Sequence, residues 1–160
     1  MTAWTQETFS HPRFSAQFLW HHDRLWAIQI LPPTPTSTPA SAWGPPLARI
    51  IATWGTAAPA WPDLPLAYER VSLFSWRVLH RLRDLVPWGT TTTYGHLSQL
   101  LGTSPRAIGR VMAANPWPLL FPCHRVLAAH GLGGYGPGTV LKTILLQEEG
   151  SWPKAGVRNS

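Results

Sequence analysis

The chain has 160 residues, of which 44% are hydrophobic and 12% charged, with a formal net charge of +6 and one cysteine. This length suits one compact domain or two small subdomains with a real core. No apolar run is long enough to span a bilayer, and one cysteine excludes an internal disulfide and a cysteine-rich zinc site. The first residues lack the basic and apolar regions of a secretory signal, so we expect a cytoplasmic protein with no membrane partner.

The basic charge is confined to the second half of the chain. Residues 1–68 hold three basic and three acidic side chains, which leaves ten basic and four acidic side chains for residues 69–160. Such asymmetry favours a polyanionic partner such as nucleic acid, and the alternative is an ordinary basic surface.

The first half predicts a small sheet and a short helix. Residues 13–20 and 24–30 read as two strands of a hairpin, because they alternate partly and are rich in aromatic residues. The adjacent histidines in the turn between them favour an exposed turn over a metal site, since they lack a nearby acidic or histidine partner. Residues 32–46 are rich in proline, threonine and serine, which predicts a surface loop. A helix is then expected over residues 47–54.

The second half predicts three helices before the cysteine. Residues 72–86 carry apolar side chains at helical spacing, and we expect four of them to face inward: Phe74, Val78, Leu82 and Leu85. A second helix over residues 94–101 has Thr93 as its N-cap and Gly102 as its end, with three inward leucines: Leu97, Leu100 and Leu101.

The third of these helices is expected over residues 105–114. Ser104 suits the N-cap and Pro105 the first helical position. Two short helices around a turn that contains a glycine, the second with arginines, indicate a helix-turn-helix. That arrangement also occurs in proteins that do not bind DNA.

The only cysteine follows in a proline-rich segment, residues 115–126, which we expect to be stiff and extended. Cys123 stands between Pro122 and His124, and a neighbouring histidine or cation lowers a thiol pKa and activates the sulfur. The alternative is a small buried core residue. A strand over residues 126–129, a glycine-rich loop over 131–138 and a helix over 139–149 complete the pattern.

These motifs resemble those of the O6-alkylguanine-DNA alkyltransferase family. The resemblance covers about residues 72–150 and rests on a series of short segments at the family's spacing. They are Val86-Pro87-Trp88-Gly89-Thr90, Thr93-Tyr94-Gly95, Arg106-Ala107-Ile108-Gly109, Asn115-Pro116, Pro122-Cys123-His124-Arg125-Val126, the Gly133-Gly134-Tyr135 loop, Lys142, and Leu145-Leu146-Gln147-Glu148-Glu149-Gly150. The first half is similar to the family only in the order of its elements.

The resemblance implies an α+β fold. A small N-terminal β-sheet subdomain of ribonuclease H-like type would occupy residues 1–68. A mostly helical subdomain with the helix-turn-helix, over residues 69–150, would bind DNA and accept the alkyl group. Residues 151–160 would form a disordered tail.

The resemblance also implies direct-reversal DNA repair. As a methylated-DNA–protein-cysteine S-methyltransferase, the protein would bind double-stranded DNA in the minor groove as a monomer, associated with the nucleoid if it is bacterial. It would flip an O6-alkylguanine into a pocket and transfer the alkyl group irreversibly to its own cysteine, with no cofactor and no metal.

Site residues follow from the same resemblance, position by position. Cys123 would be the acceptor, His124 the base that takes the thiol proton through a water, and Glu149 the acid that orients the histidine. Asn115 would brace the turn beneath the cysteine, and Tyr94 would hydrogen-bond the guanine. The DNA-binding residues would be Arg106, as the side chain that replaces the flipped base, with Ala107, Arg110, Tyr94 and Arg125. The pocket would be formed by Val126, Tyr135, Gly136 and Lys142.

Two departures and two alternatives stay open. The family's Ser-Gly-Gly is replaced here by Gly136-Pro137-Gly138, which removes a hydroxyl from the pocket, and Arg110 stands where relatives often have a small residue. One alternative is a non-enzymatic lesion-binding protein, although such relatives have the cysteine replaced. The other is a helix-turn-helix regulator, which would leave the cysteine motif without a role.

Overall fold

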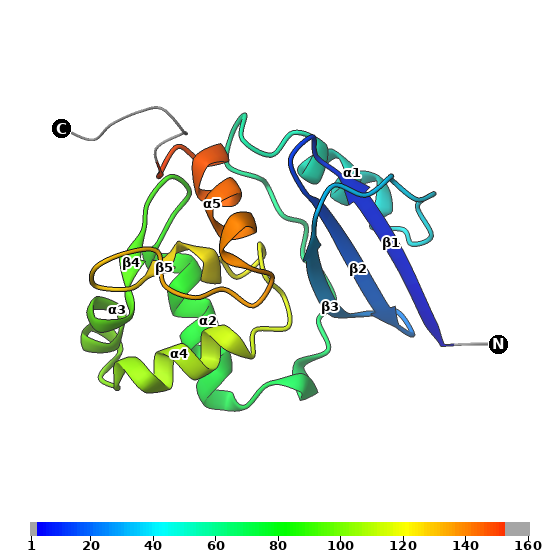
Figure 1. Cartoon of the computed structure of the whole chain (residues 1–160). Helices are drawn as coiled ribbons and strands as arrows, with labels where there is room; N and C mark the ends of the chain where they lie inside the picture. The colour runs from blue at the N-terminus through cyan, green and yellow to red at the C-terminus, as the bar shows by residue number, and fades with distance from the viewer. Residues whose placement is uncertain (1–2, 153–160) are drawn as a thin grey trace.

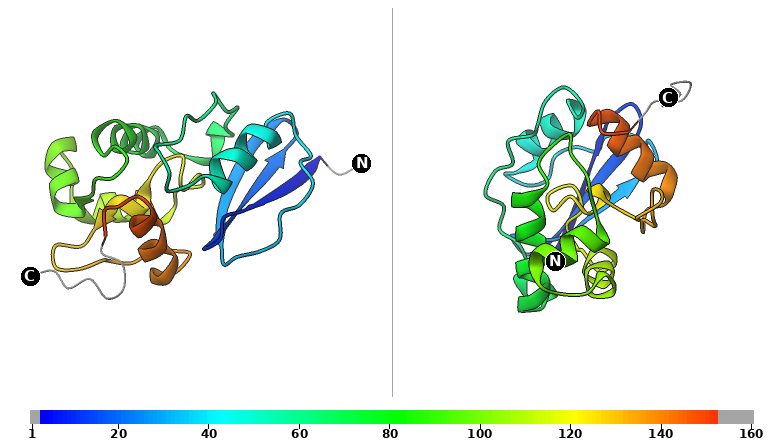
Figure 2. Two further views of the ribbon diagram at one scale, coloured as in Figure 1. Left: turned by 90° about the horizontal axis from the view of Figure 1, so that it is seen from above. Right: turned by 90° about the vertical axis from the view of Figure 1, so that its left-hand side faces the viewer.

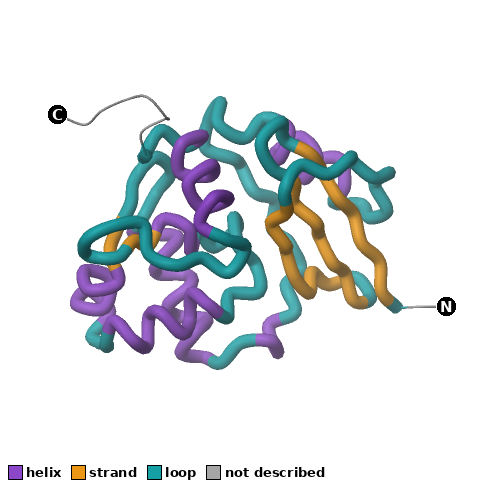
Figure 3. Tube along the Cα trace, viewed as in Figure 1, coloured by secondary structure: helices purple, strands orange, loops and turns teal. Residues whose placement is uncertain are grey.

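The computed structural model describes residues 3–152, and it has the mixed α+β architecture that the sequence predicts. Strands gather in one lobe and most helices in the other (Figures 1 and 3). The strand lobe holds a three-stranded antiparallel sheet in the order β1-β2-β3, formed by β1 (Trp4–Ser10), β2 (Ser15–His21) and β3 (Arg24–Leu31). Figure 2 shows the two lobes side by side from above.

Strands β2 and β3 confirm the predicted hairpin, whereas β1 was not predicted. Its sequence Trp-Thr-Gln-Glu-Thr-Phe-Ser is mostly polar, and it carries a buried acid, Glu7. The Glu7 carboxylate accepts hydrogen bonds from the indole N–H of Trp20, from the backbone N–H groups of Ala40 and Ser41, and from the Ser41 hydroxyl. Burial of this acid is therefore compensated by bonds that distant residues supply.

The same bonds anchor the proline-rich segment to the free edge of β1. Thr8 exchanges two bonds with Ser37, one from its backbone N–H to the serine hydroxyl and one from the serine N–H to its carbonyl. Exposed strand edges invite pairing with other chains, and a covering segment prevents it. Helix α1 (Gly44–Ala52) then begins earlier than predicted, since its prolines stand in the first turn, where no backbone N–H is required.

The helical lobe matches the predicted boundaries within one or two residues. It contains α2 (Leu73–Leu85), α3 (Tyr94–Leu101), α4 (Pro105–Ala113) and α5 (Thr139–Glu148), with two short 3-10 turns, Tyr68–Arg70 and Cys123–Arg125. The side chains of the two predicted N-caps, Thr93 and Ser104, accept the expected backbone bonds, and Ser72, which was not predicted as a cap, does the same at the start of α2. Gly102 ends α3 with a φ of 66°. The helix-turn-helix is confirmed as a structural unit.

Three side chains predicted to face inward are exposed instead: Phe74, Leu85 and Leu100. Phe74 and Leu85 lie near the two ends of α2, and Leu100 lies in the last turn of α3. Helical spacing places a residue on a face, but packing decides how far that face is covered.

A two-stranded parallel pair links the helix-turn-helix to the cysteine segment. Strand β4 (Thr92–Thr93) pairs with β5 (Val126–Leu127), which is shorter than the predicted strand over 126–129. The pairing sets the start of α3, with Tyr94, beside the residues that follow Cys123.

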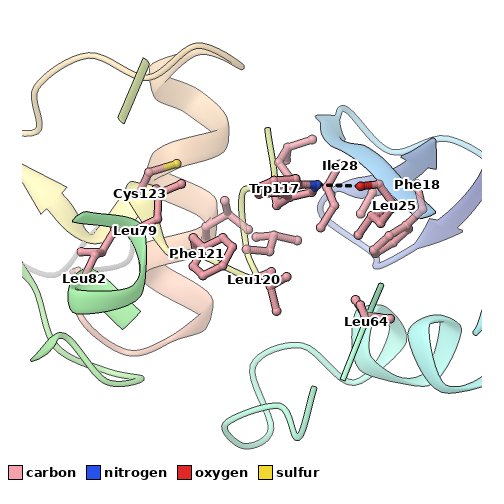
Figure 4. Packing of buried hydrophobic residues seen from close by; sticks show 14 of the residues in the cluster. Phe18, Leu25, Ile28, Leu64, Leu79, Leu82, Trp117, Leu120, Phe121 and Cys123 are labelled. Carbon is pink, nitrogen blue, oxygen red and sulfur yellow. Dashed lines mark hydrogen bonds between the residues drawn. The ribbon is translucent and has the colours of Figure 1, made fainter. Parts of the chain in front are cut away.

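The cysteine segment also docks against the sheet. The indole N–H of Trp117 donates to the Leu25 carbonyl at 3.0 Å (Figure 4), and the Ile28 N–H donates to the Pro116 carbonyl at 2.8 Å. One hydrophobic cluster runs from Phe18 in the sheet through Trp117 and Phe121 to the helical lobe. The position of the cysteine is therefore fixed by both halves of the chain.

The predicted tail falls mostly outside the described residues. Ser151 still belongs to the end of α5, because its N–H donates to the Leu146 carbonyl, and residues 153–160 lie outside the description. Between residues 3 and 152 no helix has the length and apolar character needed to cross a membrane.

Candidate active site

The segment before the cysteine is a series of turns, and the prediction of an extended segment was wrong. Asn115 folds it back: its side-chain N–H donates to the Phe121 carbonyl at 2.9 Å, while its side-chain oxygen accepts from the Trp117 N–H at 3.0 Å. Leu119 adopts a φ of 73°, a left-handed conformation that a non-glycine residue holds only when its surroundings impose it. Asn115 thus braces the turn that leads into Cys123.

His124, the residue after Cys123, forms a buried pair with Glu149. The Nε2 atom of His124 lies 2.7 Å from a Glu149 carboxylate oxygen, and both side chains are fully buried. Since a carboxylate only accepts, Nε2 carries the proton and donates it. Nδ1 is then an acceptor, and it is buried without a hydrogen-bond partner among the described residues. The pair therefore leaves one basic nitrogen unused on the residue next to Cys123.

Arg125 is not at the DNA-binding surface, and the prediction of that role was wrong. Its guanidinium is buried and donates to both Glu149 carboxylate oxygens, at 2.9 and 3.1 Å, and to the Val86 carbonyl at 3.0 Å. These bonds occupy the guanidinium. Burial alone would raise the pKa of Glu149, but the charges and hydrogen bonds of His124 and Arg125 outweigh it and hold the pKa below its usual range. Arg125 therefore keeps Glu149 ionised.

The Cys123 thiol is buried, and burial raises its pKa above that of an ordinary cysteine. An Asn115 hydrogen bond, the Lys142 charge and the Tyr135 hydroxyl oppose this effect without overcoming it. The Tyr135 hydroxyl is itself buried, and burial, followed by the effect of Cys123, raises its pKa well above normal. At neutral pH the resting sulfur is therefore a thiol, which needs a base to become a nucleophile.

Lys142 is buried behind the site and does not reach the hollow beside Cys123 described below. Its ammonium donates to the carbonyls of Val126 and Gly134, at 2.8 and 3.0 Å, which ties the glycine-rich loop to β5. Burial lowers the pKa of Lys142 to about 8, although the charge of Cys123 opposes the shift. Val126 is fully buried and also lies behind the hollow, so these two residues of the expected pocket support it from outside.

A hollow of about 220 Å³ opens beside the sulfur, and we name it the Tyr94 hollow. Its wall includes Tyr94, Cys123, Tyr135 and Gly136, which are four of the predicted site residues. Sequence reasoning missed four further wall residues: Gly109, Met112, Ala113 and Gly134. The first three share one face of α4 at helical spacing, a signal that the sequence contained.

The glycine-rich loop packs closely against Ala128 and the Tyr94 ring at the edge of this hollow. Gly133 has a φ of 74°, and a Cβ atom there would lie 3.1 Å from the Ala128 nitrogen and 3.4 Å from the Tyr94 ring. Glycine thus permits both the backbone conformation and the close approach. Tyr94 is half-buried, and burial, followed by the charge of Cys123, raises the pKa of its hydroxyl. Tyr94 therefore keeps its proton at neutral pH and can donate it in a hydrogen bond.

Helix α4 presents two cations beside the hollow. Arg106 and Arg110 are both exposed, one turn apart, while Ala107 between them is half-buried and gives its backbone N–H to the Ser104 cap. The opposite face of α4 is buried through Ile108, Val111 and Met112. The helix thus points a basic face outward while its C-terminal end reaches the cysteine.

Comparison with known proteins places this arrangement in a family. Residues 73–151 match the model described as 6-O-methylguanine DNA methyltransferase, DNA binding domain. A methylated-DNA–protein-cysteine methyltransferase of Metallosphaera sedula is 47% identical over 89 residues, which is 56% of each chain. The chain spans about half the length of the curated relatives it matches.

Solved structures resemble nearly the whole chain. The O6-methylguanine-DNA methyltransferase of Pyrococcus kodakaraensis has a TM-score of 0.75 and 28% identity, covering 91% of this chain and 98% of that one. The Mycobacterium tuberculosis protein OGT in complex with DNA has a TM-score of 0.72 and 30% identity, covering 91% and 92%. Because the likeness extends over both lobes as well as the motif region, the chain belongs to the O6-methylguanine-DNA methyltransferase family.

Proposed function

We propose that this protein repairs DNA by transferring an alkyl group from O6 of a flipped-out guanine to Cys123, once per molecule. Residues 69–150 would bind the duplex through its minor groove and carry out the transfer, and residues 1–68 would support the cysteine segment. The observation that carries the proposal is the buried His124–Glu149 pair, which leaves an acceptor nitrogen without a partner on the residue that follows Cys123 in the chain.

Activation of the thiol follows from this pair. Glu149 holds the His124 tautomer with its proton on Nε2, so Nδ1 accepts the thiol proton through a bridging water. The imidazolium that forms is stabilised by the Glu149 carboxylate, which Arg125 keeps ionised. Burial raises the energy of the thiolate, so the sulfur is charged only when the proton has a place to go.

Helix α4 and Tyr94 would move the alkylated guanine out of the duplex and hold it near Cys123. The O6 atom of a stacked guanine is out of reach of a side chain, so the nucleotide must leave the duplex. Arg106 would occupy the vacated place in the stack, and Arg110 would contact a phosphate. The guanine would enter the Tyr94 hollow, where the Tyr94 hydroxyl donates a hydrogen bond to the base as it leaves.

The chemical step is one displacement. The sulfur of Cys123 forms a bond to the alkyl carbon while the bond from that carbon to O6 breaks. The electron pair of that bond stays with the guanine, which takes up a proton in place of the one that the thiol has lost. The products are a neutral guanine and a thioether on Cys123. A thioether is a poor leaving group, so each molecule acts once.

Intact mass spectrometry tests the proposal. Incubation with duplex DNA that carries O6-methylguanine should raise the protein mass by one methyl group, with one group per molecule at saturation. Cys123→Ala should gain no mass and still bind the duplex, since the change removes only the acceptor. Methyl groups that remain on the DNA, or a mass gain in Cys123→Ala, would overturn the assignment.

Arg106→Ala should slow transfer from duplex DNA by about 10- to 100-fold, the equivalent of about 1–3 kcal/mol for one lost base-stack contact. Transfer from free O6-benzylguanine should not change, because no base has to be flipped. Arg110→Ala is the matched control: it should weaken DNA binding uniformly and reduce the salt dependence of the affinity by about one counterion. Equal losses on duplex and free base in Arg106→Ala would contradict the role.

A further inference from the structure

Three of the large apolar side chains that the described chain exposes lie together at the start of α2. They are Tyr68 in the preceding 3-10 turn, Leu73 and Phe74, with exposed fractions of 48%, 66% and 46%. Two of them border a hollow of about 430 Å³, which we name the α2 groove, and its lining residues are Tyr68, Val71, Ser72, Leu73 and Trp76. Scattered apolar side chains are normal on a protein surface, but a contiguous group marks an interaction site.

The walls of the α2 groove are held in place by the protein core. The rings of Tyr68 and Trp76 meet edge to face, with their centroids 4.4 Å apart. Trp76 in turn packs edge to face against Phe121 at 6.2 Å, and Phe121 is fully buried. Ser72 caps α2 by accepting the Ser75 N–H, which fixes the start of the helix at the groove. The groove is therefore preformed, and its volume lies in the range of pockets that take apolar groups.

Two arginines without partners extend from the groove along α2. Arg77 lies one turn after Leu73 and Arg81 lies one turn further, and both are exposed. Residues four apart are neighbours on a helix surface, so Arg77 stands beside the groove. Neither arginine side chain has a hydrogen bond, an ion pair or a ring contact with the rest of the chain that the structure describes. The start of α2 adds the partial positive charge of a helix N-terminus.

The acidic side chains of this region leave the positive charge in excess. Glu69, in the 3-10 turn, is already bonded to Arg24, whose guanidinium donates to it at 2.8 Å. Asp84 lies three residues beyond Arg81, at the end of α2 that is far from the groove. An acidic ligand at the groove would therefore meet cations that have no other partner.

We propose that the α2 groove docks an acidic peptide segment of a partner protein, with one aromatic or aliphatic side chain in the hollow and carboxylates on Arg77 and Arg81. A peptide is favoured over nucleic acid, because phosphates and sugars offer nothing apolar to cover Leu73 and Phe74. None of the residues that line the groove lines the Tyr94 hollow, so a docked peptide does not occupy the proposed guanine site.

Fluorescence anisotropy with a labelled synthetic peptide tests the inference. The peptide has four aspartates followed by a leucine and a phenylalanine, and a reference peptide has alanine in place of the last two residues. The first should bind the whole chain with a Kd of about 1–100 μM, as expected for a small transient interface, and added salt should weaken it. The reference should bind about tenfold more weakly or less, because it buries no large apolar side chain.

Two matched pairs of variants locate the binding. Leu73→Asp should weaken peptide binding by about tenfold or more, whereas Val140→Asp, the same kind of change in the first turn of α5, should leave the Kd unchanged. Arg77→Gln should weaken binding by about two- to fivefold, whereas Arg49→Gln on α1 should have no effect. All four side chains are exposed, so the variants should fold normally, which circular dichroism checks.

Four results would overturn the inference. Two concern the peptides: no binding at about 1 mM, or equal affinity for the two peptides, which would show charge attraction alone. The third is loss of duplex DNA binding in Leu73→Asp without loss of peptide binding, which would make the groove a DNA contact. The fourth is self-association of the unaltered protein in sedimentation that Leu73→Asp abolishes, which would make the groove an interface between two copies. The proposed alkyl transfer is tested separately, because this inference does not rest on it.

Discussion

Glu149→Gln is expected to slow alkyl transfer by about 100-fold or more, the usual contribution of general acid–base catalysis. It should also lower the free energy of unfolding by about 3–5 kcal/mol, because it leaves the buried Arg125 guanidinium without its carboxylate. The amide cannot hold both the Arg125 bonds and the His124 tautomer, since it offers one acceptor oxygen where the carboxylate offers two. Single-turnover transfer rates and denaturant unfolding measure the two effects.

Glu148→Gln is the matched control for this variant. Glu148 is the neighbouring acid, and it faces the N-terminal lobe, where it pairs with Arg13 at 2.8 Å and lies 3.7 Å from His11 Nε2. Its removal should cost about 1 kcal/mol or less and leave the transfer rate unchanged. If Glu148→Gln and Glu149→Gln lost transfer equally, the orienting role of Glu149 would be wrong.

Acid titration provides a second measurement, which compares the unaltered protein with Glu149→Gln. The pKa of Glu149 is lower in the folded protein than in the unfolded chain, so the unfolded state binds more protons as the pH falls. The stability that Glu149 contributes is complete above the unfolded pKa of about 4.3 and is lost as the pH falls through the folded pKa. The stability difference between the unaltered protein and Glu149→Gln should therefore shrink below about pH 4.

Lys142→Met is expected to lower the free energy of unfolding by about 2–3 kcal/mol, since it removes two hydrogen bonds from a buried charged group. The freed glycine-rich loop should exchange its amide hydrogens faster. Loss of the Lys142 charge also raises the pKa of the Cys123 thiol further, so transfer at neutral pH should slow by about three- to tenfold. Hydrogen exchange, unfolding and the pH dependence of thiol alkylation measure these changes.

The pH dependence has a defined sign. Lys142 has a pKa of about 8 in the folded protein, against about 10.4 in the unfolded chain, so the unfolded state binds more protons between these values. Stability from this group therefore rises as the pH rises from about 8 to about 10. The comparison is made in the Cys123→Ala background, which removes titration of the thiol.

Val140→Met is the control for the added methionine. Val140 is exposed on the same helix, so its replacement should change stability by about 0.5 kcal/mol or less. An unchanged thiol pKa in Lys142→Met would contradict the electrostatic effect of Lys142. Unchanged amide exchange in residues 131–138 would contradict its role as the tie of the loop.

The sequence by itself determined the elements whose signals are local. The caps Thr93 and Ser104 act on a backbone N–H three residues away, and Gly102 ends its helix through its own φ. Such interactions join residues within one helical turn of each other, so they can be predicted from the sequence without knowledge of the fold. The motif around Cys123 likewise identified the family, although the first half carried no comparable motif.

Tertiary structure decided the features that depend on distant partners. Strand β1 was missed because its stability comes from pairing with β2 and from the bonds that residues 40 and 41 make to Glu7. Arg125 was assigned to the surface because its partner, Glu149, stands 24 residues further along the chain. The local sequence around an arginine next to a reactive cysteine does not show whether the arginine faces DNA or a buried acid.

The contact between the cysteine segment and the sheet is the clearest case of the second kind. It exists because Trp117 reaches the Leu25 carbonyl across 92 residues and Ile28 bonds to Pro116, which brings an edge strand against the cysteine segment. No pattern in either segment predicts these contacts, since both acceptors are backbone carbonyls, which every residue possesses. The sequence determined which residue we propose as the alkyl acceptor, and the packing of the two lobes decided what surrounds it.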